Sequence, residues 1–214
     1  MDVYETEREQ VEALRKWWQE NGKALIIGVV LGLGGLFGYR AWQDHVTATA
    51  ESAADLHAGL VAAVEQGQHA TVIAESARLR NEFGDTPYAA LGTLAEARVL
   101  VADGDPEAAR ASLQWVIEHA DQPDVVDVAR LRLARLLFAL GEYDAARARL
   151  AEVPAERFAA EVAELRGDLL READQPEAAR EAYLEALGAE SENRAIVQMK
   201  LDELGLEPAP ESTL

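Results

Sequence analysis

The sequence predicts an all-α protein in which one transmembrane helix near the N-terminus precedes a solenoid of helical hairpins. Three observations carry this prediction. An uncharged apolar run of 16 residues lies between Lys23 and Arg40. A turn motif occurs three times further along the chain. The composition is rich in Ala, Leu, Glu and Arg and only 6% aromatic, without β-branched runs or Asn-Gly hairpin signals.

The apolar run from Ala24 to Tyr39 is the expected membrane span. Sixteen helical residues rise ~24 Å, which falls short of the ~30 Å hydrocarbon core of a bilayer. Ala41 and Trp42 extend the run, and Lys23 and Arg40 can snorkel their charges into the headgroups. Aromatic rings that prefer the membrane interface flank the run, at Trp17, Trp18, Tyr39 and Trp42. We therefore expect a transmembrane helix over residues 23–42.

Three other interpretations of this run are weaker. In a soluble core helix each of its glycines would cost ~1 kcal/mol against alanine, whereas glycine is common in lipid-embedded helices. A cleaved signal peptide has a suitable triplet at Ala48–Ala50, but six acidic residues precede the run and the triplet lies well beyond it. A nucleotide-binding loop is excluded because Gly32, Gly34 and Gly38 miss the G-x-G-x-x-G spacing and no strand precedes them.

The glycines of the span form two pairs at helical spacing, Gly28 with Gly32 and Gly34 with Gly38. Such small-residue pairs let a second transmembrane helix approach closely. A simpler interpretation, in which the bilayer merely tolerates glycine, stays open. The predicted transmembrane packing residues are Gly28, Gly32, Gly34, Gly35 and Gly38.

The flanking charges predict the orientation. Four basic residues precede the span, and after Arg40 the next basic residue is Arg78. Positive charge is retained inside, so the N-terminus is expected in the cytoplasm and the rest of the chain across the membrane.

Residues 1–22 are expected to form a cytoplasmic helix. Its apolar stripe consists of Tyr4, Val11, Leu14 and Trp18. The stripe suits either a membrane partner or the membrane surface itself. Asn21 and Gly22 are expected to break or bend this helix before the span.

The repeated turn motif reads GDPEAAR at 104–110, GEYDAAR at 141–147 and DQPEAAR at 174–180. The copies are 37 and 33 residues apart, and Gly67 marks a degenerate first copy 37 residues before Gly104. Periods near 34 residues with helix–turn–helix content indicate tetratricopeptide-like repeats. Glycine in the first two copies suits a left-handed helix cap, and proline in the first and third copies suits the first turn of the next helix.

The repeats are expected to occupy residues 43–205, with a flexible tail over residues 206–214. Ala109, Ala146 and Ala179 should be buried where the two helices of a repeat meet. Helices are expected over 44–66, continuing the span with or without a break, and over 88–102, 125–140, 157–170 and 196–204.

Most of the acidity belongs to this domain, because the chain up to Arg40 holds only five of the 20 basic and six of the 39 acidic residues. The net charge of −19 disfavours nucleic acid and anionic headgroups. We expect a groove in such a domain to favour basic or neutral polypeptide.

The residues give no sign of catalysis. The absence of cysteine excludes a disulfide scaffold and thiol chemistry. The four histidines lack the spacing of a metal site, and neither a nucleophile elbow nor a Walker loop occurs. No catalytic, cofactor-binding or metal residue is predicted.

Several stretches resemble the YfgM family of ancillary SecYEG translocon subunits. The specific stretch is N-terminal: Tyr4-Glu5, residues 10–13 (QVEA), residues 20–24 (ENGKA) and the glycine-rich span closed by Arg40 and Trp42. Further similar stretches follow in the same order at 88–91 (YAAL), 131–135 (LRLAR), 165–167 (LRG) and 198–200 (QMK).

The resemblance implies a single-span protein of the bacterial inner membrane with a periplasmic repeat domain. It also implies association with SecYEG and with a PpiD-like periplasmic chaperone, in the passage of translocated polypeptides from the channel to chaperones. A different hypothesis stays open, in which the repeats form a membrane-tethered scaffold for another envelope assembly or stress-response system, since stacked hairpins suit either role.

Overall fold

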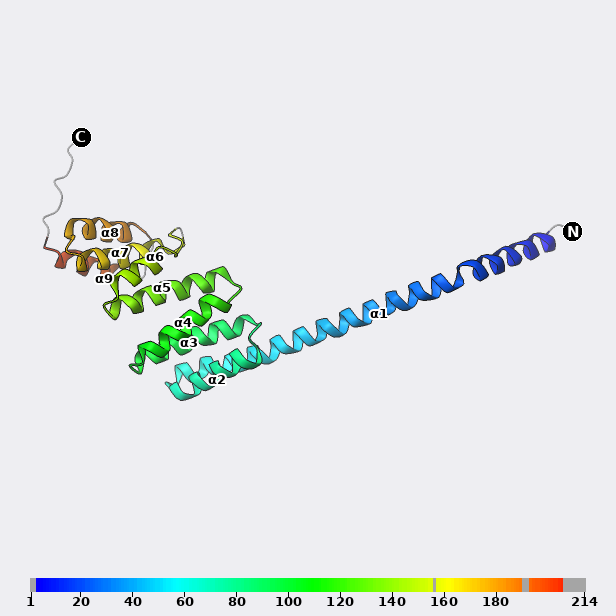
Figure 1. Ribbon diagram of the computed structural model, residues 1–214, viewed down its shortest axis with the longest axis horizontal. Helices are drawn as coiled ribbons and strands as arrows, with labels where there is room; N and C mark the ends of the chain where they lie inside the picture. The colour runs from blue at the N-terminus through cyan, green and yellow to red at the C-terminus, as the bar shows by residue number, and fades with distance from the viewer. Residues whose placement is uncertain (1–2, 156, 190–192, 206–214) are drawn as a thin grey trace, which may run out of the picture. The chain divides into compact units, whose positions relative to one another are not determined.

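The computed structural model describes residues 3–155, 157–189 and 193–205. All elements in these ranges are helices (Figure 1), as the sequence predicts. The chain divides into two compact units, Met1–Ser52 and Ala53–Leu214, which are considered separately here. The predicted tail and the Tyr4 side chain lie outside the described residues.

The first unit belongs to one long helix, and its continuity corrects one prediction. Helix α1 runs from Val3 to Glu65 and passes through Asn21 and Gly22 without a break. The Asn21 side chain donates to the Trp17 carbonyl at 3.1 Å. The Trp18 ring covers Gly22, where an added Cβ would lie 3.2 Å from it. The ~1 kcal/mol helix penalty of a glycine is therefore too small to end the helix here. The same continuity joins the span to the predicted helix over residues 44–66.

The second unit comprises the end of α1 and eight further helices among the described residues. Their bounds are α2 His69–Glu82, α3 Pro87–Ala102, α4 Pro106–His119, α5 Pro123–Ala139, α6 Tyr143–Leu150, α7 Ala159–Glu172, α8 Pro176–Gly188 and α9 Arg194–Glu203. Consecutive helices from α2 to α9 contact one another, as in stacked hairpins (Figure 1). Contacts of α3 with α5 and of α5 with α7 place these three helices along one face, which we call the inner face.

The turns have the geometry that the repeated motif predicts. Gly67, Gly104 and Gly141 adopt positive φ angles of 66°, 80° and 77°, and Asp174 takes the equivalent place at 55°. After each of them, the next amide donates to a carbonyl five residues back, as in a Schellman cap: Gln68 to Ala63, Asp105 to Leu100, Glu142 to Leu137 and Gln175 to Leu170. These turns therefore end their helices in the same way.

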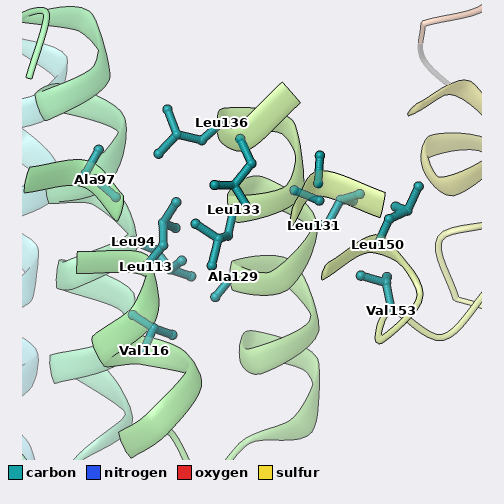
Figure 2. Packing of buried hydrophobic residues seen from close by; sticks show 14 of the residues in the cluster. Leu94, Ala97, Leu113, Val116, Ala129, Leu131, Leu133, Leu136, Leu150 and Val153 are labelled. Carbon is teal, nitrogen blue, oxygen red and sulfur yellow. The ribbon is translucent and has the colours of Figure 1, made fainter. Parts of the chain in front are cut away.

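The core follows the stack of hairpins, and α5 lies at its centre. Figure 2 shows Leu133 and Leu136 directed toward α3 and α4, where they meet Leu94 and Leu113. Leu131 points the other way, toward Leu150 of α6 and Val153 just after it (Figure 2). Burial of one such side chain contributes ~1.5–3 kcal/mol. A central repeat is covered by neighbours on both sides, which explains why α5 is apolar on more than one face.

A buried polar network joins α7, α8 and α9. The Tyr183 ring packs so closely on Gly167 that a Cβ there would lie 2.4 Å from it, and the Tyr183 hydroxyl donates to Asp168 at 2.7 Å. Lys200 of α9 donates to Glu164 and Asp168, each at 2.7 Å. Because both carboxylates are buried, Lys200 supplies the charge that their burial requires.

Candidate functional site

The apolar part of α1 presents its large side chains exposed. Helix residues from Leu25 onward are long and apolar enough to cross a membrane, and none of the most apolar window is buried. A core helix of a soluble protein would instead be covered. Its large side chains are between 45% exposed, at Leu25, and 70% exposed, at Leu31. This helix is therefore a candidate membrane span.

The five glycines of this segment leave open space around the helix. A Cβ added at Gly28, Gly32, Gly34, Gly35 or Gly38 would meet no other atom within 4 Å. The described chain thus uses none of these positions for close packing. They remain available to a helix of another protein.

The predicted interface anchors lie exposed at both ends of the span. Trp17 and Trp18 precede it, and Tyr39 and Trp42 follow, with the last two rings 6.0 Å apart. Lys23 and Arg40, at the two ends of the apolar run, are exposed as well. Two further apolar side chains, Val11 and Leu14, are exposed on the N-terminal part of α1.

The three repeat alanines are fully buried. Ala109, Ala146 and Ala179 each have 0% relative exposure, and so does Val72 at the equivalent place of the first hairpin. Their amides donate to the carbonyl of the residue just before each helix, for example Ala146 to Glu142 at 2.9 Å. These positions therefore hold the start of each second helix against the stack.

The inner face carries a recess of about 510 Å³ between α3 and α5, which we call the arginine recess. Arg98 of α3 and Arg132 and Arg135 of α5 line it. Its apolar lining includes Val101, Leu136 and Ala139. The expectation of an acidic groove is wrong here, because net charge does not say where the charges lie, and arginines from two helices converge at this point.

Sequence reasoning did not single out these arginines, although the repeat offers a signal. Arg98 and Arg135 each stand six residues before a turn glycine, Gly104 and Gly141 respectively. Repeat positions that carry the same charge on adjacent inner helices come together in the stack. Arg132, one helical turn before Arg135, adds the third guanidinium.

The histidines are spread over the domain. His69 contacts Asp103 at 2.5 Å, and His119 stacks on Trp115 with ring centroids 4.7 Å apart. Among the described residues, no three His, Cys, Asp or Glu side chains gather as metal ligands would.

Comparisons with known proteins identify the family. The model of the tetratricopeptide repeat-like domain family matches residues 15–206. A protein of Escherichia coli strain K12, named ancillary SecYEG translocon subunit, is 35% identical over 96% of this chain and all of its own length. Relatives with the same name in Haemophilus influenzae and Neisseria gonorrhoeae are 32% and 27% identical, over 94% and 95% of this chain.

The chain belongs to the ancillary SecYEG translocon subunit family. This membership confirms the resemblance found in the sequence. The match with the Escherichia coli subunit covers so much of the chain that it includes the apolar part of α1 as well as the repeats. The tetratricopeptide-like fold is typical of proteins that bind other proteins through the inner face of the stack.

Proposed function

We propose that this chain is a non-enzymatic ancillary subunit of a SecYEG translocon in the bacterial inner membrane, and that it links the channel to a PpiD-like periplasmic chaperone. The observation that carries the proposal is similarity to named translocon subunits over nearly the whole chain, anchor included. A shared repeat fold alone would be much weaker support for this function, since unrelated proteins use the same repeats.

Residues 23–42 form the single span in this proposal, with residues 1–22 in the cytoplasm and residues 43–205 in the periplasm. The positive-inside rule supports this orientation. Arg15, Lys16 and Lys23 lie before the apolar run, and no basic residue occurs between Arg40 and Arg78.

The anchor docks on the channel through its glycines. Helices in lipid gain little from hydrophobic association, so close backbone approach and van der Waals packing drive their contact. Open space beside Gly28, Gly32 and Gly35 lets a neighbouring helix come near. The exposed Trp17, Trp18, Tyr39 and Trp42 hold the span at the depth where this contact forms.

The cytoplasmic part of α1 extends this contact beyond the membrane. Because α1 is helical through Asn21 and Gly22, the preceding turns belong to the same helix as the span. The exposed stripe of Val11, Leu14 and Trp18 is then directed at a protein partner that rises from the membrane, and the bilayer surface suits it less.

A pair of chimeras tests this division of labour. The first replaces residues 1–42 by an unrelated single span, and the second keeps residues 1–42 but replaces the repeat domain by an inert periplasmic domain. We expect the first to lose co-purification with SecYEG in mild detergent and to retain the chaperone. The second should keep SecYEG and lose the chaperone. Full recovery of SecYEG with the foreign span would contradict docking through the anchor.

A further inference from the structure

The arginine recess concentrates positive charge in a strongly acidic protein. Arg98, Arg132 and Arg135 face a hollow of about 510 Å³ in a chain whose formal net charge is −19. Like charges repel, and this repulsion costs free energy unless an anion offsets it. A chain with 39 acidic residues could easily supply carboxylates, so their scarcity here requires an explanation.

Arg132 makes a single polar contact among the described residues, a donation to the Leu94 carbonyl at 3.3 Å. Partial desolvation lowers the pKa of Arg132, although the residue is exposed overall, and the charges of Arg98 and Arg135 lower it further. A carboxylate in the recess would raise this pKa again, because an opposite charge favours the charged guanidinium.

The other two arginines leave most of their hydrogen-bonding capacity unused. Arg98 is exposed and makes no hydrogen bond or ion pair within the described part of the chain. Arg135 approaches Glu164 at 3.4 Å, but Glu164 also accepts from Lys200 at the shorter distance of 2.7 Å. A guanidinium has five N–H donors, so all three arginines can donate to further acceptor oxygens.

Most arginines of the described repeat domain outside the recess are paired with carboxylates; Arg194 instead donates to the Leu187 carbonyl, and Arg180 makes no ion pair among the described residues. Arg80 contacts the buried Glu96, Arg130 lies 3.0 Å from Asp127, and Arg149 lies 3.0 Å from Glu152. Ion pairing is therefore common in this domain. The three recess arginines have only one ion pair among the described residues, between Arg135 and Glu164 at 3.4 Å. They lie on the face through which stacked hairpins bind their ligands.

The recess also has an apolar side. Val101 is 50% exposed on it, beside Leu136 and Ala139. An exposed valine next to three guanidiniums matches a ligand that presents an apolar side chain beside a carboxylate. Polypeptides carry both groups on adjacent residues. A membrane surface fits poorly, because a domain with such negative net charge is repelled by anionic headgroups.

We propose that the arginine recess binds a polypeptide segment in which an acidic side chain adjoins an apolar one, with the carboxylate held by Arg98, Arg132 and Arg135 and the apolar side chain placed against Val101. Arginine suits this task because its planar fork can bind a carboxylate through two hydrogen bonds. This inference goes beyond the proposed function, and its test does not involve the channel. Its failure would leave the assignment to the translocon unaffected.

Capped eight-residue peptides test the recess on the full-length protein in a neutral detergent. One fluorescent peptide alternates leucine with glutamate, a second replaces glutamate by glutamine, and a third replaces it by lysine. Anisotropy titrations at low salt should give about tenfold tighter binding of the glutamate peptide than of the glutamine peptide. The lysine peptide should bind most weakly, and the preference for glutamate should shrink as salt is added.

Single substitutions locate the binding. Arg98→Gln and Arg132→Gln should each weaken binding of the glutamate peptide about tenfold and leave the glutamine peptide unchanged. Arg98 makes no hydrogen bond or ion pair within the described part of the chain, so Arg98→Gln should keep the thermal stability of the parent. Arg78→Gln is the matched control, because Arg78 lies on α2 and pairs with Glu82 at 3.4 Å, away from the recess.

Equal binding of the glutamate and glutamine peptides would overturn the proposal, as would an unchanged preference in both recess variants. Two further outcomes would show that the recess binds a different ligand. Displacement of the peptide by phosphatidylglycerol in mixed micelles would assign the recess to lipid headgroups. Tighter peptide binding after deletion of residues 206–214, which contain Glu207 and Glu211, would assign it to the chain's own tail.

Discussion

At the scale of single residues, the repeat depends on backbone conformation at the turns. A left-handed residue costs ~1–2 kcal/mol for an ordinary L-amino acid, and glycine avoids this cost. Three turns use Gly67, Gly104 and Gly141, whereas the fourth uses Asp174 at a φ of 55°. Aspartate tolerates this region better than most residues because its short polar side chain can hydrogen-bond locally. The position in the repeat thus sets the left-handed backbone conformation at the turn, and either glycine or aspartate occupies it.

Two glycine-to-alanine substitutions should act with opposite sign. Gly141→Ala introduces a Cβ at a φ of 77° and should destabilise the protein by about 1 kcal/mol. Gly188→Ala makes the same chemical change at the end of α8, without a positive φ and with open space around it, and should be neutral or stabilising by up to ~1 kcal/mol. Urea unfolding followed by circular dichroism measures both. Equal losses at the two sites would show that turn geometry is not the cause.

At the scale of elements, the sequence predicts the hairpins well because their signals are local. A glycine, a helix start and an alanine pair recur within seven residues, and each acts through the backbone next to it. The observed α3, α5 and α9 begin and end within about two residues of the predicted helices. Helix α7 also lies within two residues of its prediction, since it runs from Ala159 to Glu172 and the predicted range is 157–170.

Contacts within one helix and between helices explain what the sequence did not predict. Asn21 and Gly22 carry a turn signal, but the Trp17 carbonyl and the Trp18 ring satisfy them within the helix. The arginine recess combines residues 34 and 37 positions apart, and it exists only once α3 and α5 are stacked. Net charge sums over the whole surface, so it gives no information on such a local reversal.

The contact of α8 with α7 should make the free energy of unfolding fall at alkaline pH. Tyr183 is fully buried, and burial raises the pKa of its phenol above the ordinary value of 10, with a further contribution from the hydrogen bond to Asp168. Below pH ~10 the tyrosine is protonated in the folded and unfolded states, and its contribution to stability is fully present. As the pH rises further, only the unfolded state loses the proton, so stability falls by up to ~1.4 kcal/mol per pH unit.

Tyr183→Phe should remove this alkaline loss. The variant lacks the hydrogen bond to a carboxylate and should be less stable than the parent by ~1.5–3 kcal/mol at pH 8. The gap should narrow above pH 10, because phenylalanine does not ionise. Urea midpoints at pH 8, 10 and 11 measure the gap. Tyr88→Phe is the control, since Tyr88 makes no side-chain hydrogen bond among the described residues, and it should leave the pH profile unchanged. A gap that stays constant with pH would contradict the buried, proton-retaining phenol.

At the scale of the whole molecule, the asymmetry of charge makes the topology testable. Basic residues cluster before the span, and the acidic domain follows it. Retention of positive charge in the cytoplasm predicts that the N-terminus stays inside, uncleaved, while the domain is exported. The chain contains no cysteine, so a single introduced thiol is a unique label. Glu12 lies before the span, and the exposed Glu177 lies in the third complete copy of the turn motif.

Glu12→Cys and Glu177→Cys should therefore react differently with a membrane-impermeant maleimide. In intact spheroplasts, where the periplasmic face is open to solvent, we expect label on the Glu177→Cys protein and none on the Glu12→Cys protein. After lysis both should react, which controls for the reactivity of the thiol itself. Labelling at position 12 before lysis would show that the N-terminus is periplasmic. The apolar stripe of α1 could then not contact the cytoplasmic side of the channel. If the mature protein instead lacked the N-terminal segment that contains position 12, the apolar run would be identified as a cleaved signal.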